Sequence, residues 1–235
     1  NNGDGTFTDV SFEAGISAHR GSGMGVIGAD YDDDGDTDIV VANDAMANFV
    51  FENDGTGKFT EAGLITGLAY DGNGQVQGSM AVDCGDYDND GDLDLFFTTV
   101  YGTASFGRKN YPVLYRNDGR FSFVDANALA KLPKLSPTYQ AAWADYDNDG
   151  DPDLYVNNFG PNVLYRNNGD GTFSDISEAS GVSAVAGTGM GMVCADYDND
   201  GDTDVFIGND VSENFLFQND GTGKFEEVGL VAGSA

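Results

Sequence analysis

Residues 196–225 read DYDNDGDTDVFIGNDVSENFLFQNDGTGKF and contain the pattern that decides the fold. The first nine of them follow D-x-D-x-D-G-D-x-D, and this pattern occurs four times, starting at Asp30, Asp86, Asp145 and Asp196. The starts are 56, 59 and 51 residues apart, a spacing typical of a repeated supersecondary unit. The chain is therefore predicted to be a tandem array of four such units.

Each unit continues in the same order around its aspartate loop. A small and apolar segment precedes the loop, as at 24–29, and runs of branched and aromatic residues follow it, as at 39–41 and 48–51. A glycine turn such as 53–57 then leads to a last run at Phe59. Such short runs favour strands, and Gly with Asn or Asp supplies the positive φ of hairpin turns. The predicted fold class is all-β, with four antiparallel strands per unit.

The predicted repeats cover approximately residues 20–62, 76–125, 137–175 and 186–227 of a single array, 1–235. Residues 1–10 are predicted to be the fourth strand of a unit that lacks its first three strands. The reason is that NNGDGTFTDVSFEAGIS at the start matches NNGDGTFSDISEASGVS at 167–183. Two interpretations stay open at this stage. The chain is a fragment of a larger ring, or its spare end pairs with a neighbouring subunit.

Composition limits the class of protein. The chain has 40 acidic and 10 basic residues in 235 and a formal charge of −30, which argues against binding nucleic acid or an anionic membrane. A hydrophobic content of 40% argues against disorder. We expect no membrane insertion and no signal peptide, and we expect Cys84 and Cys194 to be buried thiols rather than a bridge or a redox pair.

The four aspartate loops hold 21 of the 40 acidic residues. Two carboxylates about 4 Å apart repel by roughly 4 kcal/mol at an effective dielectric constant of 20, so the loops call for a cation. Oxygen ligands at positions 1, 3 and 5, a glycine at 6 and a main-chain carbonyl at 7 are typical of the opening of a calcium loop. The absence of histidine and thiolate ligands disfavours zinc and copper, and magnesium demands a tighter octahedron.

We predict four Ca²⁺ sites, each with side-chain ligands at positions 1, 3, 5 and 9 and a carbonyl ligand at position 7. The predicted metal residues are Asp30, Asp32, Asp34, Asp36, Asp38, Asp86, Asp88, Asp90, Asp92, Asp94, Asp145, Asp147, Asp149, Asp151, Asp153, Asp196, Asp198, Asp200, Asp202 and Asp204. The position-2 tyrosines are expected to point away from the ion. Asp33 is expected to face solvent, and at Asp83 we favour a surface charge over a group supporting the metal ligands.

The loop between strands, the strand after it and the turn LYRNNGDGTF at 164–173 resemble FG-GAP repeats of the integrin α-subunit type, in their bacterial VCBS-like form. The resemblance covers essentially the whole chain. It implies a β-propeller architecture with four-stranded blades, as a closed ring or an open or intermolecular array. It also implies calcium at the first hairpin of each blade and roles in adhesion, extracellular matrix or glycan recognition.

The leading functional hypothesis is a calcium-binding, extracellular or cell-surface protein with a structural or adhesive role, secreted and self-assembling head to tail into a filament or surface array. Its partners would be calcium and other subunits. The alternative is a glycan-binding propeller, or the calcium-dependent propeller domain of a larger polysaccharide-active or adhesion protein, with candidate sugar-stacking residues Trp143, Tyr101, Phe106 and Tyr139. We expect no enzyme, because the single histidine, His19, stands apart from any nucleophile motif.

Overall fold

The computed structural model describes residues 1–100, 110–133 and 137–233. Within these ranges the chain forms four blades of four strands, which confirms the predicted all-β fold of propeller-type blades. Blades 1 and 2 contain β1 (Gly23–Ala29), β2 (Asp38–Met46), β3 (Phe49–Asn53), β4 (Phe59–Glu61), β5 (Gln77–Gly85), β6 (Asp94–Thr99), β7 (Val113–Asn117) and β8 (Phe123–Asp125). Blades 3 and 4 contain β9 (Thr138–Ala144), β10 (Asp153–Pro161), β11 (Val163–Asn167), β12 (Phe173–Asp175), β13 (Ala186–Ala195), β14 (Asp204–Asn209), β15 (Phe215–Asn219) and β16 (Phe225–Glu227).

Short helical turns follow the strands of three blades and precede blade 1. They are η1 (Ile16–Ala18), α1 (Gly63–Thr66), α2 (Ser177–Ser180) and α3 (Gly229–Ala232). No helix in the described ranges has both the length and the apolar character needed to span a membrane.

Consecutive strands of a blade pair antiparallel, and the aspartate loop is the connection between the first two. Ala29 pairs with Asp38 at the base of the first loop, and Ala195 pairs with Asp204 at the base of the fourth. The end of β2 also pairs with β5, and the end of β10 with β13, so neighbouring blades share backbone hydrogen bonds. The four loops therefore occupy equivalent positions on successive blades.

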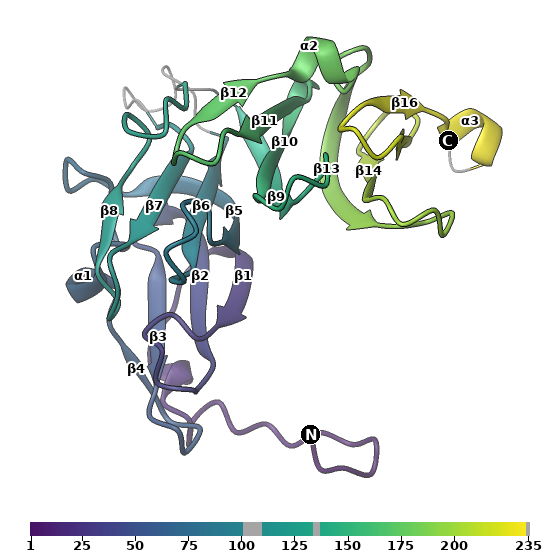
Figure 1. The fold of residues 1–235 in the computed structure, drawn as a ribbon. Coiled ribbons are helices and arrows are strands. Elements are labelled where there is room, and N and C mark those ends of the chain that lie inside the picture. Colours follow the sequence, from purple (N-terminus) through teal and green to yellow (C-terminus); the bar gives the residue numbers. More distant parts are fainter. Residues whose placement is uncertain (101–109, 134–136, 234–235) are drawn as a thin grey trace.

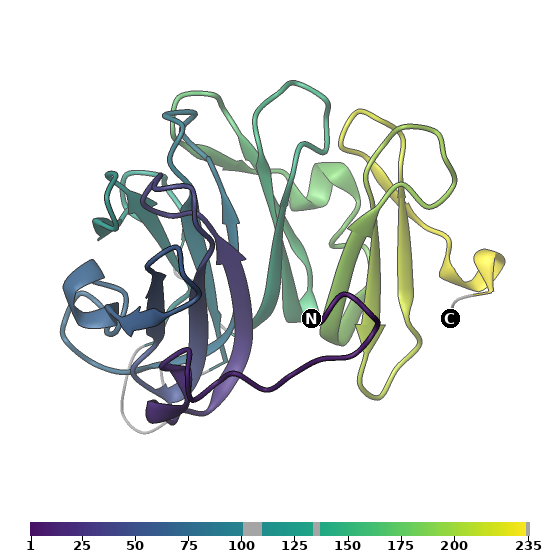
Figure 2. The ribbon, with the colours of Figure 1, turned by 90° about the horizontal axis from the view of Figure 1, so that it is seen from below.

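The blades follow one another around an open arc (Figure 1, Figure 2). Residues 1–10 contain no assigned strand and extend away from blade 1 (Figure 1). Asp4 nonetheless accepts a 2.9 Å hydrogen bond from the Thr6 N–H, as Asp170 does from the Thr172 N–H at 3.0 Å in the turn before β12. That this segment belongs to an incomplete unit stays a prediction.

The hydrophobic core consists of three clusters, each between two successive blades. The clusters contain Leu95 and Phe97 between blades 1 and 2, Leu154 and Val156 between blades 2 and 3, and Val205 and Ile207 between blades 3 and 4. Because successive side chains of a strand point to opposite faces, each blade contributes to the cluster on either side of it. Cys84 and Cys194 are free thiols, each half-buried at the edge of one cluster.

The position-2 tyrosines of the first three loops belong to this core. Tyr31, Tyr87 and Tyr146 are 2%, 2% and 0% exposed. Their rings pack on the phenylalanine that begins the fourth strand of the following blade, with centroids 6.4, 5.9 and 5.7 Å from Phe123, Phe173 and Phe225. Tyr197 of the fourth loop is 43% exposed. Each of the first three loops thus contacts the next blade through an aromatic pair.

Candidate metal centres

Each aspartate loop is shaped by two residues with positive φ. Position 4 is left-handed at Asp33, Asn89, Asn148 and Asn199, with φ of 61°, 58°, 59° and 63°. Position 6 is glycine with φ from 92° to 100°, which a residue with a Cβ adopts only under strain. Asp and Asn tolerate the left-handed region better than other residues, so both positions follow from sequence. The resulting turn brings alternate side chains to one side.

The position-1 carboxylate stabilises this turn by accepting hydrogen bonds from backbone N–H groups of the same loop. Asp30 accepts hydrogen bonds from the Asp34 and Gly35 N–H groups at 3.2 and 2.9 Å, and the same pair of contacts recurs at Asp86, Asp145 and Asp196. Each carboxylate oxygen has two lone-pair directions, so these contacts leave acceptor capacity on both oxygens. Position 1 is therefore both a structural acceptor and an available ligand.

Three carboxylates converge in every loop, with one oxygen from each lying within 4.8 Å of the others. The sets are Asp30, Asp32 and Asp38; Asp86, Asp88 and Asp90; Asp145, Asp147 and Asp153; and Asp196, Asp198 and Asp204. Three loops combine positions 1, 3 and 9, and the second combines positions 1, 3 and 5. All of these residues belong to the predicted ligand set.

The position-3 carboxylate has a buried oxygen without a hydrogen-bond partner in three of the loops. Oδ1 of Asp32, Asp88 and Asp147 is buried and receives no hydrogen bond. In the fourth loop, Asp198 accepts a hydrogen bond from Gln218 Nε2. An unpaired buried carboxylate oxygen is costly, and a bound cation removes that cost.

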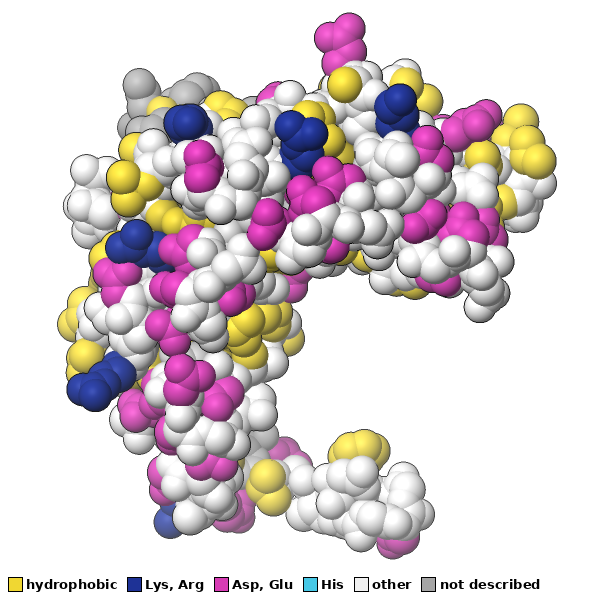
Figure 3. Space-filling model, in the orientation of Figure 1, with side chains coloured by type: hydrophobic (Ala, Val, Ile, Leu, Met, Phe, Trp, Pro, Cys, Tyr) yellow, Lys and Arg dark blue, Asp and Glu magenta, His cyan; other side chains and the backbone are white. Residues whose placement is uncertain are grey.

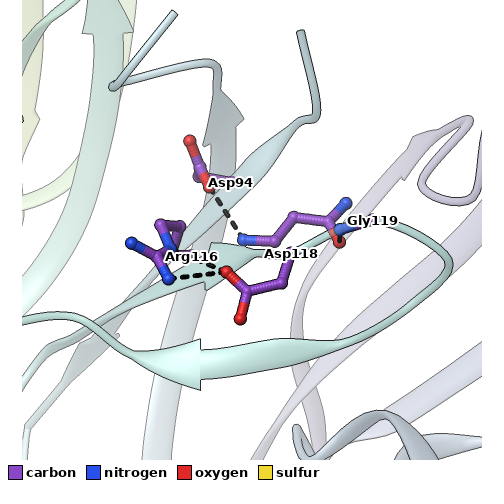
Figure 4. Close-up of polar contacts among 5 residues, drawn as sticks. Asp94, Arg116, Asp118 and Gly119 are labelled. Carbon is purple, nitrogen blue, oxygen red and sulfur yellow. Dashed lines mark hydrogen bonds and ion pairs between the residues drawn. The ribbon is translucent and has the colours of Figure 1, made fainter. Parts of the chain in front are cut away.

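The position-9 aspartate holds the loop to the third strand of its own blade. Asp94 is fully buried and accepts hydrogen bonds from the Tyr87 N–H at 2.9 Å and the Asn117 N–H at 2.8 Å. Figure 4 shows Asp94 beside the end of this strand, next to the ion pair between Arg116 and Asp118. The equivalent pair of contacts recurs at Asp38, Asp153 and Asp204. Sequence reasoning predicted a ligand here and missed this structural role.

Burial makes the position-9 carboxylates reluctant to ionise. It raises the pKa of Asp38 to about 6, of Asp153 to about 7 and of Asp94 to about 8. Burial and the neighbouring carboxylates also raise the pKa of Asp32, Asp88 and Asp147. Acidic side chains recur on the face of the arc seen in Figure 3. A nearby cation acts in the opposite direction and favours the ionised form of each carboxylate.

Position 7 turns its side chain away from the cluster. The Asp151 carboxylate accepts a 2.7 Å hydrogen bond from Asn89 Nδ2 of the preceding loop, and Asp202 accepts one of 3.0 Å from Asn148 Nδ2. Position 4 therefore contacts position 7 of the next loop. Between the first two loops both partners are acids, Asp33 and Asp92, and the Asp33 carboxyl adds to the effect of burial in raising the pKa of Asp92.

An asparagine at the end of the third strand also joins the loops, and sequence reasoning missed it. Asn117, Asn167 and Asn219 donate from Nδ2 to the carbonyl of Tyr31, Tyr87 and Tyr146 in the preceding loop, at 3.0, 2.7 and 2.8 Å. The signal was available, because all four repeats have Asn at this place, Asn53 included.

Two other sequence expectations concern residues near the loops. The preference for a surface charge at Asp83 is wrong: this half-buried residue accepts a 3.0 Å hydrogen bond from the Trp143 N–H across the boundary between blades 2 and 3. Trp143 packs on Phe173 with centroids 5.9 Å apart. The ring of half-buried Tyr139 has its centroid 6.5 Å from that of Phe159, which is 59% exposed. Tyr101 and Phe106 lie outside the described residues.

The donor set fits a hard divalent cation. Every converging atom is an oxygen, no histidine or thiolate belongs to the clusters found among the described residues, and three loops present an unpaired buried carboxylate oxygen. Oxygen-only sets of this kind suit Ca²⁺. Positions 1, 3 and 9, with position 5, are the residues that would hold the ion.

Comparison with known proteins identifies the family. The family model described as FG-GAP-like repeat matches residues 30–97, 100–156, 145–207 and 196–235. The chain therefore belongs to the FG-GAP-like repeat family.

Two curated relatives share the name cartilage acidic protein 1. The human protein is 28% identical over 208 residues and the mouse protein 27%, and each alignment covers 85% of this chain. The chain spans only 30% of the length of each. Among solved structures, one described as the basis of specific recognition of non-reducing terminal N-acetylglucosamine by an Agrocybe aegerita lectin superposes with a TM-score of 0.53 at 20% identity, covering 91% of this chain and 54% of the other. This similarity concerns the fold alone.

Proposed function

We propose that this chain is a calcium-binding repeat protein with a structural or adhesive role outside the cell or at its surface, with one Ca²⁺ in each aspartate loop. The observation that carries the proposal is the buried, unpaired Oδ1 of Asp32, Asp88 and Asp147 within three converging carboxylates. Extracellular calcium is millimolar, which suits loops of modest affinity. Similarity to proteins named for cartilage supports the same location.

Each position of the loop contributes to ion binding in a different way. Positions 1 and 9 are preorganised by backbone N–H groups, so their orientation costs little on binding. Position 3 contributes the unpaired oxygen, position 5 completes the carboxylate set and position 7 offers its carbonyl. Bound Ca²⁺ supplies the positive charge that offsets carboxylate repulsion. Because position 9 also binds the third strand, occupancy of the loop stabilises three strands of the blade.

Isothermal titration calorimetry with Ca²⁺ on chelator-treated protein tests this assignment. We expect binding at all four loops, with Mg²⁺ binding more weakly, since Mg²⁺ requires a smaller and more regular octahedron. Heat signals no larger than those of a buffer blank at millimolar Ca²⁺ would contradict the proposal. We infer a binding role rather than a catalytic one, because the imidazole of exposed His19 contacts the rings of Phe49 and Phe51 and makes no side-chain hydrogen bond to any described residue.

A second candidate function is glycan binding, favoured by the aromatic pair of Tyr139 and exposed Phe159. Partly exposed aromatic faces are suited to stacking on sugar rings. Trp143 is less suited, because its ring packs between blades 2 and 3. Titration with N-acetylglucosamine oligosaccharides tests this function, with binding abolished by Tyr139→Ala as the expected result. Binding unaffected by that change would exclude this pair as the sugar site.

A further inference from the structure

One position on the third strand of every blade lies beside the aspartate loop of the same blade. We call it the flanking position, and it immediately precedes the asparagine that ends the third strand. Its occupants are Glu52, Arg116, Arg166 and Gln218. Phe51 pairs with Ile39, and the equivalent pairs recur in the other blades. The register therefore places each flanking residue next to the position-9 aspartate of its own loop.

The flanking side chains of blades 1–3 point toward the following blade. Val50, Leu114 and Leu164, two residues earlier in each strand, belong to the clusters between blades 1 and 2, 2 and 3, and 3 and 4. Alternate residues of a strand share a face, so the flanking residue lies on the same side. Position 3 of the loop also faces the following blade, since a Cβ on Gly223 would lie 3.3 Å from the Cβ of Asp147.

The flanking side chain reaches the position-3 carboxylate. In blade 4, Gln218 Nε2 donates a hydrogen bond directly to Asp198. In blade 2, burial raises the pKa of Asp88 and the Arg116 guanidinium acts in the opposite direction, so this arginine lies within electrostatic range of the carboxylate. Figure 4 shows that Arg116 is held by Asp118, with Nη2–O and Nε–O distances of 2.7 and 2.8 Å. The buried Oδ1 of Asp88 has no hydrogen-bond partner among the described residues and stays available to a cation.

The charge at the flanking position differs between blades 1 and 3. Burial raises the pKa of Asp32, and the Glu52 carboxylate adds to the increase. Burial also raises the pKa of Asp147, whereas the Arg166 guanidinium acts to lower it. Arg166 is exposed and forms no ion pair with any residue that the structure describes. The first loop therefore has an additional negative charge beside position 3, and the third loop has a positive charge there.

We propose that the flanking residue sets the calcium affinity of the loop in its own blade. Glu52 attracts the cation and strengthens binding at the first loop, whereas Arg116 and Arg166 repel it and weaken binding at the second and third loops. The first loop then fills at a lower Ca²⁺ concentration than the second and third. The inference rests on the proposed function, because it requires that the loops bind calcium.

Calcium titration of the chelator-treated whole chain tests the inference when each loop is followed separately by NMR. The backbone N–H of the position-6 glycine donates to the position-1 carboxylate in every loop, so its chemical shift responds when that carboxylate binds the ion. At low salt we expect Glu52→Gln to raise the midpoint of the first loop roughly threefold and Arg166→Gln to lower that of the third loop by a similar factor.

The change within a loop on substitution is the decisive quantity, because Asp33 also adds negative charge to the first loop. Arg166→Lys keeps the positive charge and should leave the midpoint of the third loop close to its original value. Glu178→Gln and Arg20→Gln are the matched controls, since they remove the same charges from exposed sites outside the loops. Neither control should shift one loop more than another.

Salt dependence separates an effect of charge from an effect of shape. The shifts caused by Glu52→Gln and Arg166→Gln should shrink as sodium chloride rises from about 20 mM to about 500 mM, because screening weakens interactions between exposed charges. Shifts that persist at high salt would contradict an electrostatic role.

A first-loop midpoint unchanged by Glu52→Gln, or a third-loop midpoint unchanged by Arg166→Gln, would overturn the inference and leave the proposed function intact. A third-loop shift that Arg166→Lys reproduces in full would equally overturn it, because side-chain shape would then determine affinity. Glycine signals that do not respond in any loop at millimolar Ca²⁺ would instead count against the proposed function.

Discussion

At the scale of single residues, the loops combine carboxylates that stabilise the turn through hydrogen bonds with a carboxylate oxygen that is free to bind a cation. Position 1 accepts backbone hydrogen bonds within the loop, and position 9 accepts them from two different segments. Position 3 alone leaves a buried oxygen unpaired in three loops. Substitutions at positions 3 and 9 should therefore affect different states of the protein.

Asp88→Asn is expected to abolish calcium binding at the second loop and leave the chain with three sites instead of four. An amide is a weaker ligand than a carboxylate for a hard cation. Without calcium the variant should be as stable as the original chain or more so, because a buried charge is removed. Calorimetric titration and thermal melting measure both effects.

Glu178→Gln is the matched control for Asp88→Asn, since it removes the same charge from an exposed site outside the loops. Loss of calcium binding in this control would mean that net charge, and not the ligand, determines calcium uptake.

Asp94→Asn is expected to have a different effect from Asp88→Asn. It should lower the free energy of unfolding by about 1–3 kcal/mol even without calcium, because one of two buried N–H groups loses its acceptor.

Asp33→Asn is expected to stabilise the chain. Asn at this position in the second and third loops donates to the position-7 aspartate of the next loop, whereas Asp33 places a second carboxyl against Asp92. Asp33 is exposed and Asp92 only half-buried, so the gain should be modest, roughly 0.5 kcal/mol in the free energy of unfolding. Asn89→Asp is the reciprocal change and should lower stability by a similar amount in denaturant titrations. Equal stability of both variants and the original chain would contradict this account.

At the scale of strands and blades, long-range asparagine contacts hold the array together. Asn167, at the end of β11, is 1% exposed and donates to carbonyls of both its own loop and the preceding one. Asn53, at the end of β3, makes the contact with its own loop alone among the described residues. Asn167 makes the contact between blades and Asn53 does not, so substitutions of these two residues can be compared to measure that contact.

Asn167→Ala is expected to lower the free energy of unfolding by about 1–3 kcal/mol, since the buried Tyr87 carbonyl loses its donor. Asn53→Ala should cost less, and the difference between the two variants measures the contact between blades. Urea unfolding under the same calcium concentration gives both values. A cost for Asn53→Ala as large as that for Asn167→Ala would show that the local contact dominates.

At the scale of the whole molecule, the open arc combines a formal charge of −30 with four acidic loops on successive blades. Calcium at 100 times its dissociation constant should stabilise the fold by about 2.7 kcal/mol per loop. For a chain of this length that corresponds to about 5–10 °C in melting temperature per loop. Chelation should reverse the gain.

Sodium chloride at matched ionic strength is the control for this prediction. Screening weakens repulsion between exposed carboxylates, yet it does not provide a partner for the buried oxygens of position 3. We therefore expect calcium to raise the melting temperature far more than sodium chloride does. Equal shifts from the two salts would indicate general charge screening without specific sites.

The sequence by itself determined the repeat, the all-β class, the family resemblance and the residues that converge in the loops. These features depend on local interactions: an Asp–Gly turn and its position-1 acceptor lie within nine residues, so the same nine-residue pattern produces the same turn contacts four times. The glycine at position 6 and the left-handed residue at position 4 show this most clearly.

Only the tertiary structure decided which blade faces stay exposed and how the loops are joined. The asparagine contacts link residues 86, 80 and 73 positions apart, and the tyrosine rings pack on phenylalanines of the following blade. Tyr146 and Tyr197 have the same local sequence, yet one is fully buried and the other is 43% exposed. Burial depends on what lies beyond the repeat, and identical local letters do not contain that information.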